Sequence, residues 1–172
     1  MNKHLITALV NNHSGVLTRI SGMFARRGYN IDSLAVCNTE DEKYSRMTIV
    51  SQGDDMTIKQ VIKQLDKMVD VIKVSELDPN MSVSRELLLV KLKVEPKQRP
   101  EIETTCRVYK AKIIDLSPES VVVELTGDPD KIDGFLKIVE PYGIIEMART
   151  GLNALERGEK SINDLIDYNE TI

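Results

Sequence analysis

The chain has 172 residues, of which 41% are hydrophobic and 29% are charged, a balance typical of globular proteins and not of disordered or collagen-like ones. Its formal net charge of -4 and its pI near 5.3 argue against a general affinity for nucleic acids or anionic membranes, which attract dense positive charge. The longest early apolar run, LITALV, is too short for a membrane span or for the core of a signal peptide. We therefore expect a cytoplasmic protein whose partners are small molecules and other proteins.

The first half of the chain alternates between strand and helix patterns. Residues 4–11 have the period-two alternation of a strand, and the next stretch has apolar residues at helical spacing up to Gly28, which suits the left-handed end of a helix. Strands are predicted at 31–38, 45–52 and 69–77. A second helix, capped by Asp54 or Asp55, lies between the last two, so the predicted order is βαββαβ.

The second half repeats this order after a polar segment that contains a proline. Helices are predicted after Pro100 and after Pro129, and the strands at 85–94, 112–116, 121–126 and 144–148. In each half a Gly-Asp pair, at Gly53 and at Gly127, stands between the third strand and the second helix. This internal repeat predicts an α+β fold of two tandem ferredoxin-like βαββαβ domains.

The predicted domains are a first domain at 1–77, a linker at 78–84, a C-terminal domain at 85–158 and a tail at 159–172. Domains of this size bury a modest fraction of their surface. We therefore expect each of them to be stabilised by contact with another domain or by dimerisation.

The sequence contains no pattern of a catalytic or metal centre. It has two histidines, His4 and His13, and neither a Walker loop, a dinucleotide-binding glycine pattern nor a His/Cys cluster with metal-ligand spacing. Cys37 and Cys106 stand apart within apolar alternation, which predicts buried, reduced thiols. A hydrolase or metal enzyme that uses His13 with Asp32 would lack a third partner.

The βαββαβ order also occurs in RNA-recognition modules, which stack bases on aromatic side chains of the first and third strands. Here those strands, HLITALVN and SRMTIVSQ, contain no aromatic residue, so the stacking platform is missing. Arg19, Arg26 and Arg27 form a basic helix face, which is either solvated or docks an acidic partner.

The segment before the first helix is more polar than a helix cap requires. A helix N-terminus carries free N–H groups and about half a positive charge, which suits a carboxylate, and Gly15 would let a ligand approach the backbone without meeting a Cβ. Asn12 and Asn30 carry donors and acceptors for the carboxylate and ammonium groups of a free amino acid. Asn12 and Ser14 are equally suited to capping the helix, so spacing alone leaves both interpretations open.

The run NNHSGVLTRISGMFARRGYNI, residues 11–31, resembles the signature of the ACT domain, in the form found in the small regulatory subunit of acetolactate synthase (acetohydroxyacid synthase). The similarity continues through YSRMTI, KQLDKMVDVIKVSEL, SRELLLVKLKV, AKIIDLSPES and IIEMARTGLNALERG, and so covers nearly the whole chain in order. His13 stands at a position that is variable in the family, and residues 159–172 have no counterpart there.

The resemblance implies a non-catalytic protein of branched-chain amino acid biosynthesis. Such a protein would bind and activate the catalytic subunit and confer feedback inhibition by valine. Thiamine diphosphate, Mg and FAD are then expected only in the catalytic subunit, and no cofactor in this chain. A stand-alone ACT-type amino-acid sensor is the alternative.

The resemblance also implies a homodimer through the ACT domain, with the amino acid between the two chains. The effector site would consist of a loop from one chain, Asn12, His13, Ser14, Gly15 and Val16, and of Asn30 and Ile31 from the other.

Overall fold

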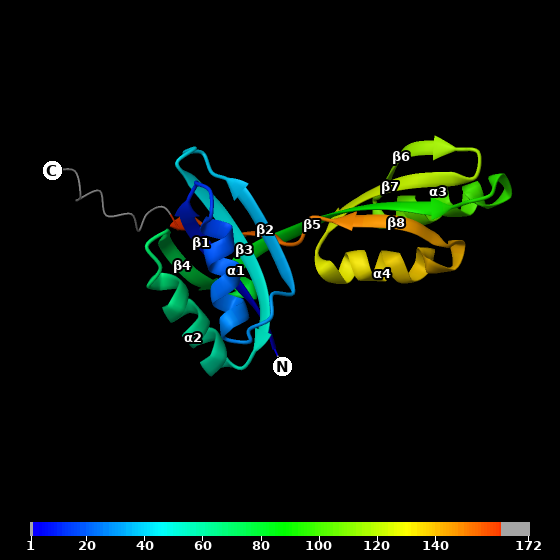
Figure 1. Cartoon of the computed structure of the whole chain (residues 1–172). Helices are drawn as coiled ribbons and strands as arrows, with labels where there is room; N and C mark the ends of the chain where they lie inside the picture. The colour runs from blue at the N-terminus through cyan, green and yellow to red at the C-terminus, as the bar shows by residue number, and fades with distance from the viewer. Residues whose placement is uncertain (1, 163–172) are drawn as a thin grey trace. The chain divides into compact units, whose positions relative to one another are not determined.

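The computed structural model describes residues 2–162, and the chain divides into two compact units (Figure 1). Within the described residues, the first unit is formed by residues 2–84 together with 152–162, and the second by Arg85–Gly151. In the described part of the chain no helix is long and apolar enough to cross a membrane.

The first unit has the predicted βαββαβ order. Its four strands form an antiparallel sheet in the order β2-β3-β1-β4, so that β1 and β3 are central. The elements are β1 (Asn2–Asn11), α1 (Val16–Arg26), β2 (Ser33–Asn38), β3 (Tyr44–Gly53), α2 (Asp55–Asp66) and β4 (Val71–Leu77).

Both helices of the first unit pack on the same face of this sheet (Figure 1). Side chains alternate along a strand, so every second residue of β1 points to the helices. The apolar residues of α1 and α2 recur every three or four positions and meet those strand residues in one core. The buried cluster includes Ile6, Ala8 and Val10 of β1, Val16, Ile20, Met23 and Phe24 of α1, and Ile58, Val61 and Leu65 of α2.

The opposite face of the first sheet is partly covered by the C-terminal segment. Leu5, Val50 and Leu77 point to that face and form a second buried cluster with Ala154 of β9 (Asn153–Glu156). After β9, the backbone N–H of Arg157 donates to the carbonyl of Met81 at 2.8 Å. The chain therefore returns to the first unit after it has completed the second.

The second unit repeats the order of the first. Its sheet order, β6-β7-β5-β8, is equivalent to that of the first sheet, and β9 also pairs with β5. The elements are β5 (Ser82–Lys93), α3 (Arg99–Tyr109), β6 (Lys112–Ser117), β7 (Ser120–Gly127), α4 (Pro129–Val139) and β8 (Ile144–Arg149), with the short 3-10 helices η1 (Pro79–Met81), η2 (Pro96–Gln98) and η3 (Glu140–Tyr142). The prediction of two tandem ferredoxin-like domains is confirmed.

The repeated Gly-Asp pairs have the same role in both units. Asp54 accepts a hydrogen bond from the backbone N–H of Thr57 at 2.7 Å, and Asp128 accepts one from that of Lys131 at 2.8 Å. Each aspartate is the N-cap of the following helix, which identifies Asp54, and not Asp55, as the cap of α2. The hydrogen bonds from Thr57 hold the pKa of Asp54 below its ordinary value.

The compact units differ from the predicted domain limits at two points. The segment 78–84, predicted as a linker, contains η1 and the first residues of β5. The predicted C-terminal domain extends to 158, whereas residues 152–158 belong to the first unit, because Leu152 and Ala154 pack on the first sheet. Most of the predicted tail, 163–172, lies outside the described residues.

The prediction for the two thiols is right for one of them. Cys106 is buried in α3, and burial raises the pKa of its thiol. Cys37 is exposed, since β2 is an edge strand whose last three residues all face solvent. Period-two alternation indicates a strand but does not distinguish an edge strand from a central one.

Candidate ligand-binding site

Asn12 positions the connection between β1 and α1. Its backbone N–H donates to the carbonyl of Lys43 at 2.7 Å, and its side-chain Nδ2 donates to the carbonyl of Glu42 at 2.8 Å. Both bonds go to the turn between β2 and β3. Glu42 lies thirty positions after Asn12 in the sequence. Asn12 therefore anchors the loop and does not cap the helix.

Helix α1 begins without a side-chain cap. Its N-cap residue is Gly15, with a φ of 89°, a left-handed conformation that glycine adopts without a Cβ penalty. The carbonyl of Gly15 accepts the first helical hydrogen bond, from Arg19 at 3.0 Å. The interpretation of Asn12 and Ser14 as caps is wrong, because no side-chain hydrogen bond closes this end in the described structure. The first N–H groups of α1 are thus left for a ligand or solvent.

The guanidinium of Arg19 adds positive charge at this helix start. A Cβ built on Gly15 would lie 3.2 Å from Nη1 of Arg19, so the guanidinium lies directly beside the glycine. The first turn of α1 contains no acidic residue. Free N–H groups, the helix dipole and a guanidinium therefore converge on one exposed position, an arrangement that favours a carboxylate.

Asp70 holds this arrangement in place. Its Oδ2 accepts a hydrogen bond from Nε of Arg19 at 2.6 Å, and its Oδ1 lies 3.1 Å from Nε2 of His13. The Asp70 side chain is only 12% exposed, and its backbone carbonyl accepts the N–H of Asn11 at 2.9 Å. The hydrogen bond from Arg19, above all, holds the pKa of Asp70 below its ordinary value.

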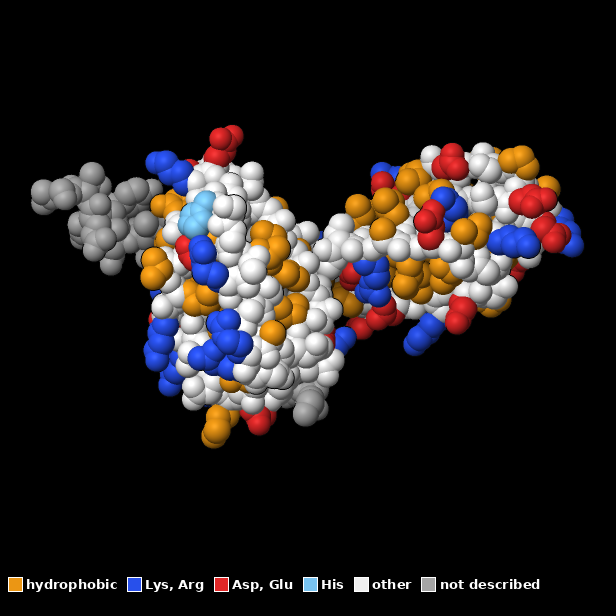
Figure 2. Space-filling model, in the orientation of Figure 1, with side chains coloured by type: hydrophobic (Ala, Val, Ile, Leu, Met, Phe, Trp, Pro, Cys, Tyr) orange, Lys and Arg blue, Asp and Glu red, His pale blue; other side chains and the backbone are white. Residues whose placement is uncertain are grey.

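Sequence reasoning missed Asp70, which stands 51 positions from Arg19, just before β4. No local pattern distinguishes it from other acidic residues at the end of a helix. The pairing also divides the predicted basic face of α1, because Arg19 is engaged by Asp70 and Nη2 of Arg27 donates to Gln64 at 2.8 Å. Figure 2 shows acidic, basic and histidine side chains next to one another on this unit.

The predicted loop residues differ in what they can offer a ligand. Asn12, His13, Ser14 and Gly15 are exposed. The side chain of Val16 is 4% exposed and belongs to the core, so Val16 can offer only its backbone N–H.

The other predicted residues, Asn30 and Ile31, follow the C-terminal end of α1, where Gly28 has the expected left-handed conformation with a φ of 68°. Nδ2 of Asn30 donates to Asp32 at 2.6 Å, and the carbonyl of Asn30 accepts a hydrogen bond from Ser51 at 2.6 Å. Ile31 is half-buried against the core.

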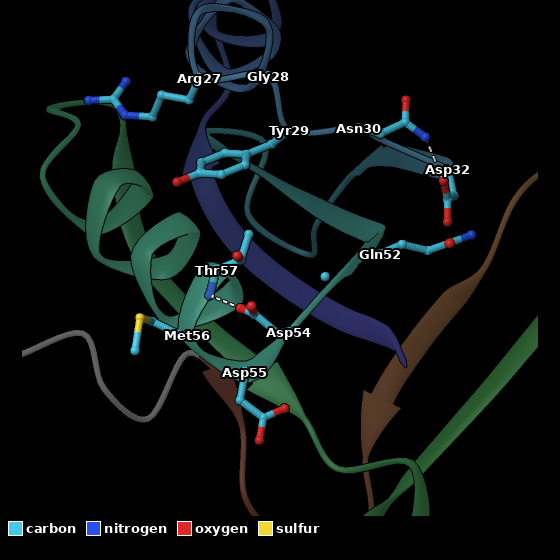
Figure 3. Close-up of a pocket in the computed structure, with 11 residues that line it drawn as sticks. Arg27, Gly28, Tyr29, Asn30, Asp32, Gln52, Asp54, Asp55, Met56 and Thr57 are labelled. Carbon is cyan, nitrogen blue, oxygen red and sulfur yellow. Dashed lines mark hydrogen bonds between the residues drawn. The ribbon is translucent and has the colours of Figure 1, made fainter. Parts of the chain in front are cut away.

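Asn30 also lines an open groove of about 1070 Å³ between the end of α1 and the start of α2 (Figure 3). The ring of Tyr29 lies across one side of the groove, and Gln52 and the capping residue Asp54 line the other. Charged side chains of both signs, Arg27 and Asp54 among them, and an aromatic ring therefore line the same groove as Asn30.

The structure places the two predicted sets at opposite ends of one helix. α1 has 11 residues, which corresponds to a length of about 16 Å at 1.5 Å per residue. A single chain thus does not bring the loop around Gly15 and the amide of Asn30 onto one amino acid. If both sets contact the same ligand, a second copy must supply one of them.

The structure does not bring together the candidate catalytic pair. His13 contacts Asp70, whereas Asp32 contacts Asn30 at the far end of α1. Within residues 2–162 no group of three or more His, Cys, Asp or Glu side chains could hold a metal ion.

Two family models match the chain and together span most of it. The model described as AHAS small subunit-like ACT domain matches residues 6–73, and the model described as small subunit of acetolactate synthase matches residues 85–158. The first match contains the whole loop before α1, Asp70 and Asn30.

Two relatives and a solved structure resemble the chain along nearly its whole length. A probable acetolactate synthase small subunit of Archaeoglobus fulgidus is 49% identical over 92% of this chain and 99% of its own. The acetolactate synthase small subunit of Mycolicibacterium smegmatis is 43% identical over 92% of this chain and 94% of its own. The crystal structure of the acetolactate synthase small subunit from Thermotoga maritima superposes with a TM-score of 0.87 and 37% identity, over 93% of this chain and 100% of that one.

Proposed function

The chain belongs to the family of acetolactate synthase small subunits, and from this membership we propose that it binds the catalytic subunit, raises its activity and makes it sensitive to valine. It is a regulatory-type subunit with an N-terminal ACT domain, related to branched-chain amino acid biosynthesis. Its catalytic partner would hold thiamine diphosphate, Mg and FAD, and this chain would hold no cofactor and no catalytic centre. The complex would work in the cytoplasm.

The observation that carries the effector proposal is the open start of α1. Its N–H groups have no side-chain cap, Gly15 leaves room beside them, and Arg19 is fixed there by Asp70. These groups suit the carboxylate of an amino acid. The exposed side chains of His13 and Ser14 would complete the loop side of the site.

The ammonium and side chain of valine would then be held by Asn30 and Ile31 of a second copy, in an ACT homodimer. Because each chain would supply only one set, valine binding would depend on how the two chains are placed against each other. An effector changes an equilibrium only through its different affinity for two states. Valine binding between two chains would therefore change how the chains are placed, and this change would be transmitted to the catalytic subunit. If each heavy atom of valine contributes about 1 kcal/mol or less of binding free energy, its Kd should lie in the micromolar to millimolar range.

The test is an assay of the catalytic subunit with and without this chain, across a valine titration. We expect higher activity when the chain is added, and inhibition by valine only in its presence. Failure of the chain to bind or to activate the catalytic subunit would contradict the regulatory role. A stand-alone amino-acid sensor, the alternative, should bring down no thiamine-dependent subunit in a co-purification.

Leucine and isoleucine, titrated in the same assay, identify which branched-chain amino acid is preferred. Alanine serves as the control, because it keeps the carboxylate and ammonium groups but lacks the branched side chain. Equal inhibition by alanine would mean that the site does not distinguish a branched side chain from a methyl group.

A further inference from the structure

A second pocket lies in the first unit, on the sheet face opposite α1 and α2. We call it the sheet-face pocket. It has a volume of about 320 Å³, and part of its lining comes from β9 and the residues that follow it. It is lined by Thr7, Arg46, Ser75 and Leu77 of the sheet and by Leu155, Glu156, Gly158, Lys160, Ser161 and Ile162 of the C-terminal segment. None of these residues belongs to the loop around Gly15 or to the groove at Asn30.

Two polar atoms of this pocket are buried without a partner in the described structure. Oγ1 of Thr7 and Nε of Arg46 are inaccessible to solvent and form no hydrogen bond there, and Thr7 as a whole is 0% exposed. A buried donor without an acceptor costs free energy, so such groups in folded proteins normally have a partner. Their presence together in one pocket indicates a missing acceptor.

The sheet register places these groups on one side. Thr7 pairs with Thr48 on β3 and with Ser75 on β4, so three hydroxyl side chains form a row across the sheet. Arg46 is two positions from Thr48 on the same strand and thus points to the same face. A row of hydroxyl groups beside a guanidinium is suited to the two oxygens of a carboxylate.

Among the charged residues that line the pocket, Arg46 is the cation best placed to bind a carboxylate. Lys160 lies 4.0 Å from Glu156, so these two charges compensate each other. Burial lowers the pKa of Arg46, and its electrostatic interactions with Cys37 and Glu40 oppose this shift. Leu77, Leu155 and Ile162 form an apolar wall next to the polar row.

We propose that the sheet-face pocket binds a small aliphatic carboxylate, with its oxygens on Thr7 and Arg46 and its alkyl group against the apolar wall. The site is separate from the proposed valine site and does not require an ammonium group on the ligand. It does not require a second copy of the chain either, because every lining residue comes from one unit.

The test uses isobutyrate as the probe, since it has a carboxylate and a branched alkyl group but no ammonium. Binding to the full chain is followed by NMR of the Thr7 methyl group and by calorimetry, with isobutyramide as the uncharged control. We expect isobutyrate to shift the Thr7 methyl signal and isobutyramide to leave it unchanged. Thr7→Val, which removes only the hydroxyl group, and Arg46→Gln should each weaken binding about tenfold or more. Thr126→Val, a threonine to valine change on β7 of the second unit, is the control and should bind as the wild type does.

Three results would overturn the proposal. They are no binding of isobutyrate to the wild type, unchanged affinity in both Thr7→Val and Arg46→Gln, and loss of binding in the presence of saturating valine. A higher Tm of Thr7→Val without any effect of isobutyrate on the wild type would mean that the Thr7 hydroxyl is buried without any partner and that the pocket binds no carboxylate. Since Gly15→Asp should leave isobutyrate binding intact, failure of the valine site and failure of the sheet-face pocket are distinguishable.

Discussion

The first turns of α1 and α3 occupy equivalent places in the two units, yet one is open and the other is closed. α1 starts at a left-handed glycine, with no side-chain cap and no acidic residue in its first turn. α3 follows the 3-10 turn η2, whose Pro96 carbonyl accepts the N–H of Arg99, and the next residue, Pro100, has no N–H to offer.

Further contacts close the start of α3. Glu101 adds a negative charge to its first turn, and the N–H of Glu95 is held by Gln98 at 3.0 Å. Arg99 points elsewhere, with Nη2 donating to the carbonyls of Ser117 and Pro118. The same fold therefore leaves the helix start open for the proposed effector in one unit, whereas a backbone hydrogen bond and a proline close the corresponding start in the other. The comparison explains why only the first unit is a candidate effector domain.

The largest effect is expected from Gly15→Asp, which would close the open start of α1. The new carboxylate would lie beside Arg19 and occupy the position proposed for the carboxylate of valine. We expect the half-inhibitory concentration of valine to rise about 100-fold or more, since losing these contacts costs about 3 kcal/mol. Activation of the catalytic subunit should survive.

Gly143→Asp is the matched control, because Gly143 has a φ of 88° but lies in the second unit. It likewise places an aspartate at a positive φ, although its ψ is 107° and that of Gly15 is -14°, and it should leave the valine response unchanged. Wild-type valine sensitivity in Gly15→Asp would show that the effector binds elsewhere.

The second change, Asn30→Ala, tests whether the far end of α1 belongs to the same site. Loss of its amide should weaken valine binding by about 1 to 3 kcal/mol, measured by calorimetry on the full chain. Asn38→Ala, at the exposed end of β2, is the control and should bind valine normally. An Asn30→Ala affinity equal to the wild-type value would remove Asn30 from the site.

The third change, Asp70→Asn, tests the network that positions Arg19 and His13. The pKa of Asp70 is lowered in the folded chain, so its ionised form stabilises the fold fully above the unfolded aspartate pKa of about 3.9. This stabilisation is lost as the pH falls from that value through the lower folded pKa.

The Tm of the wild type should therefore exceed that of Asp70→Asn at pH 7, and the difference should shrink below about pH 4. Thermal unfolding of both proteins between pH 7 and pH 3 measures it. A difference that stays constant over this range would mean that the carboxylate charge has no part in the stability of the loop.

The smallest effect is expected from Gln98→Ala, which would loosen the closed start of α3. It removes the acceptor of the Glu95 N–H and should cost about 0.5 to 1 kcal/mol of unfolding free energy. Denaturant unfolding measures this cost. Valine inhibition should not change, and a changed inhibition constant would place the second unit in the effector response.

Local patterns in the sequence were sufficient for much of the fold. The order of strands and helices, the left-handed Gly28 and the cap of α2, predicted as Asp54 or Asp55, depend on residues within a few positions of one another. For such features, side-chain periodicity and capping chemistry are visible in a short window. The resemblance of the run from 11 to 31 likewise identified the family before any contact was known.

The contacts that shape the candidate site were decided only by the tertiary structure. Asn12 is a cap candidate by its spacing, but the turn at Glu42 and Lys43 takes its hydrogen bonds. Asp70 reaches Arg19 across 51 positions, and Leu152 returns to the first sheet after the second unit is complete. A polar side chain has several possible partners, and which of them it meets depends on how distant segments pack, which no short window of sequence contains.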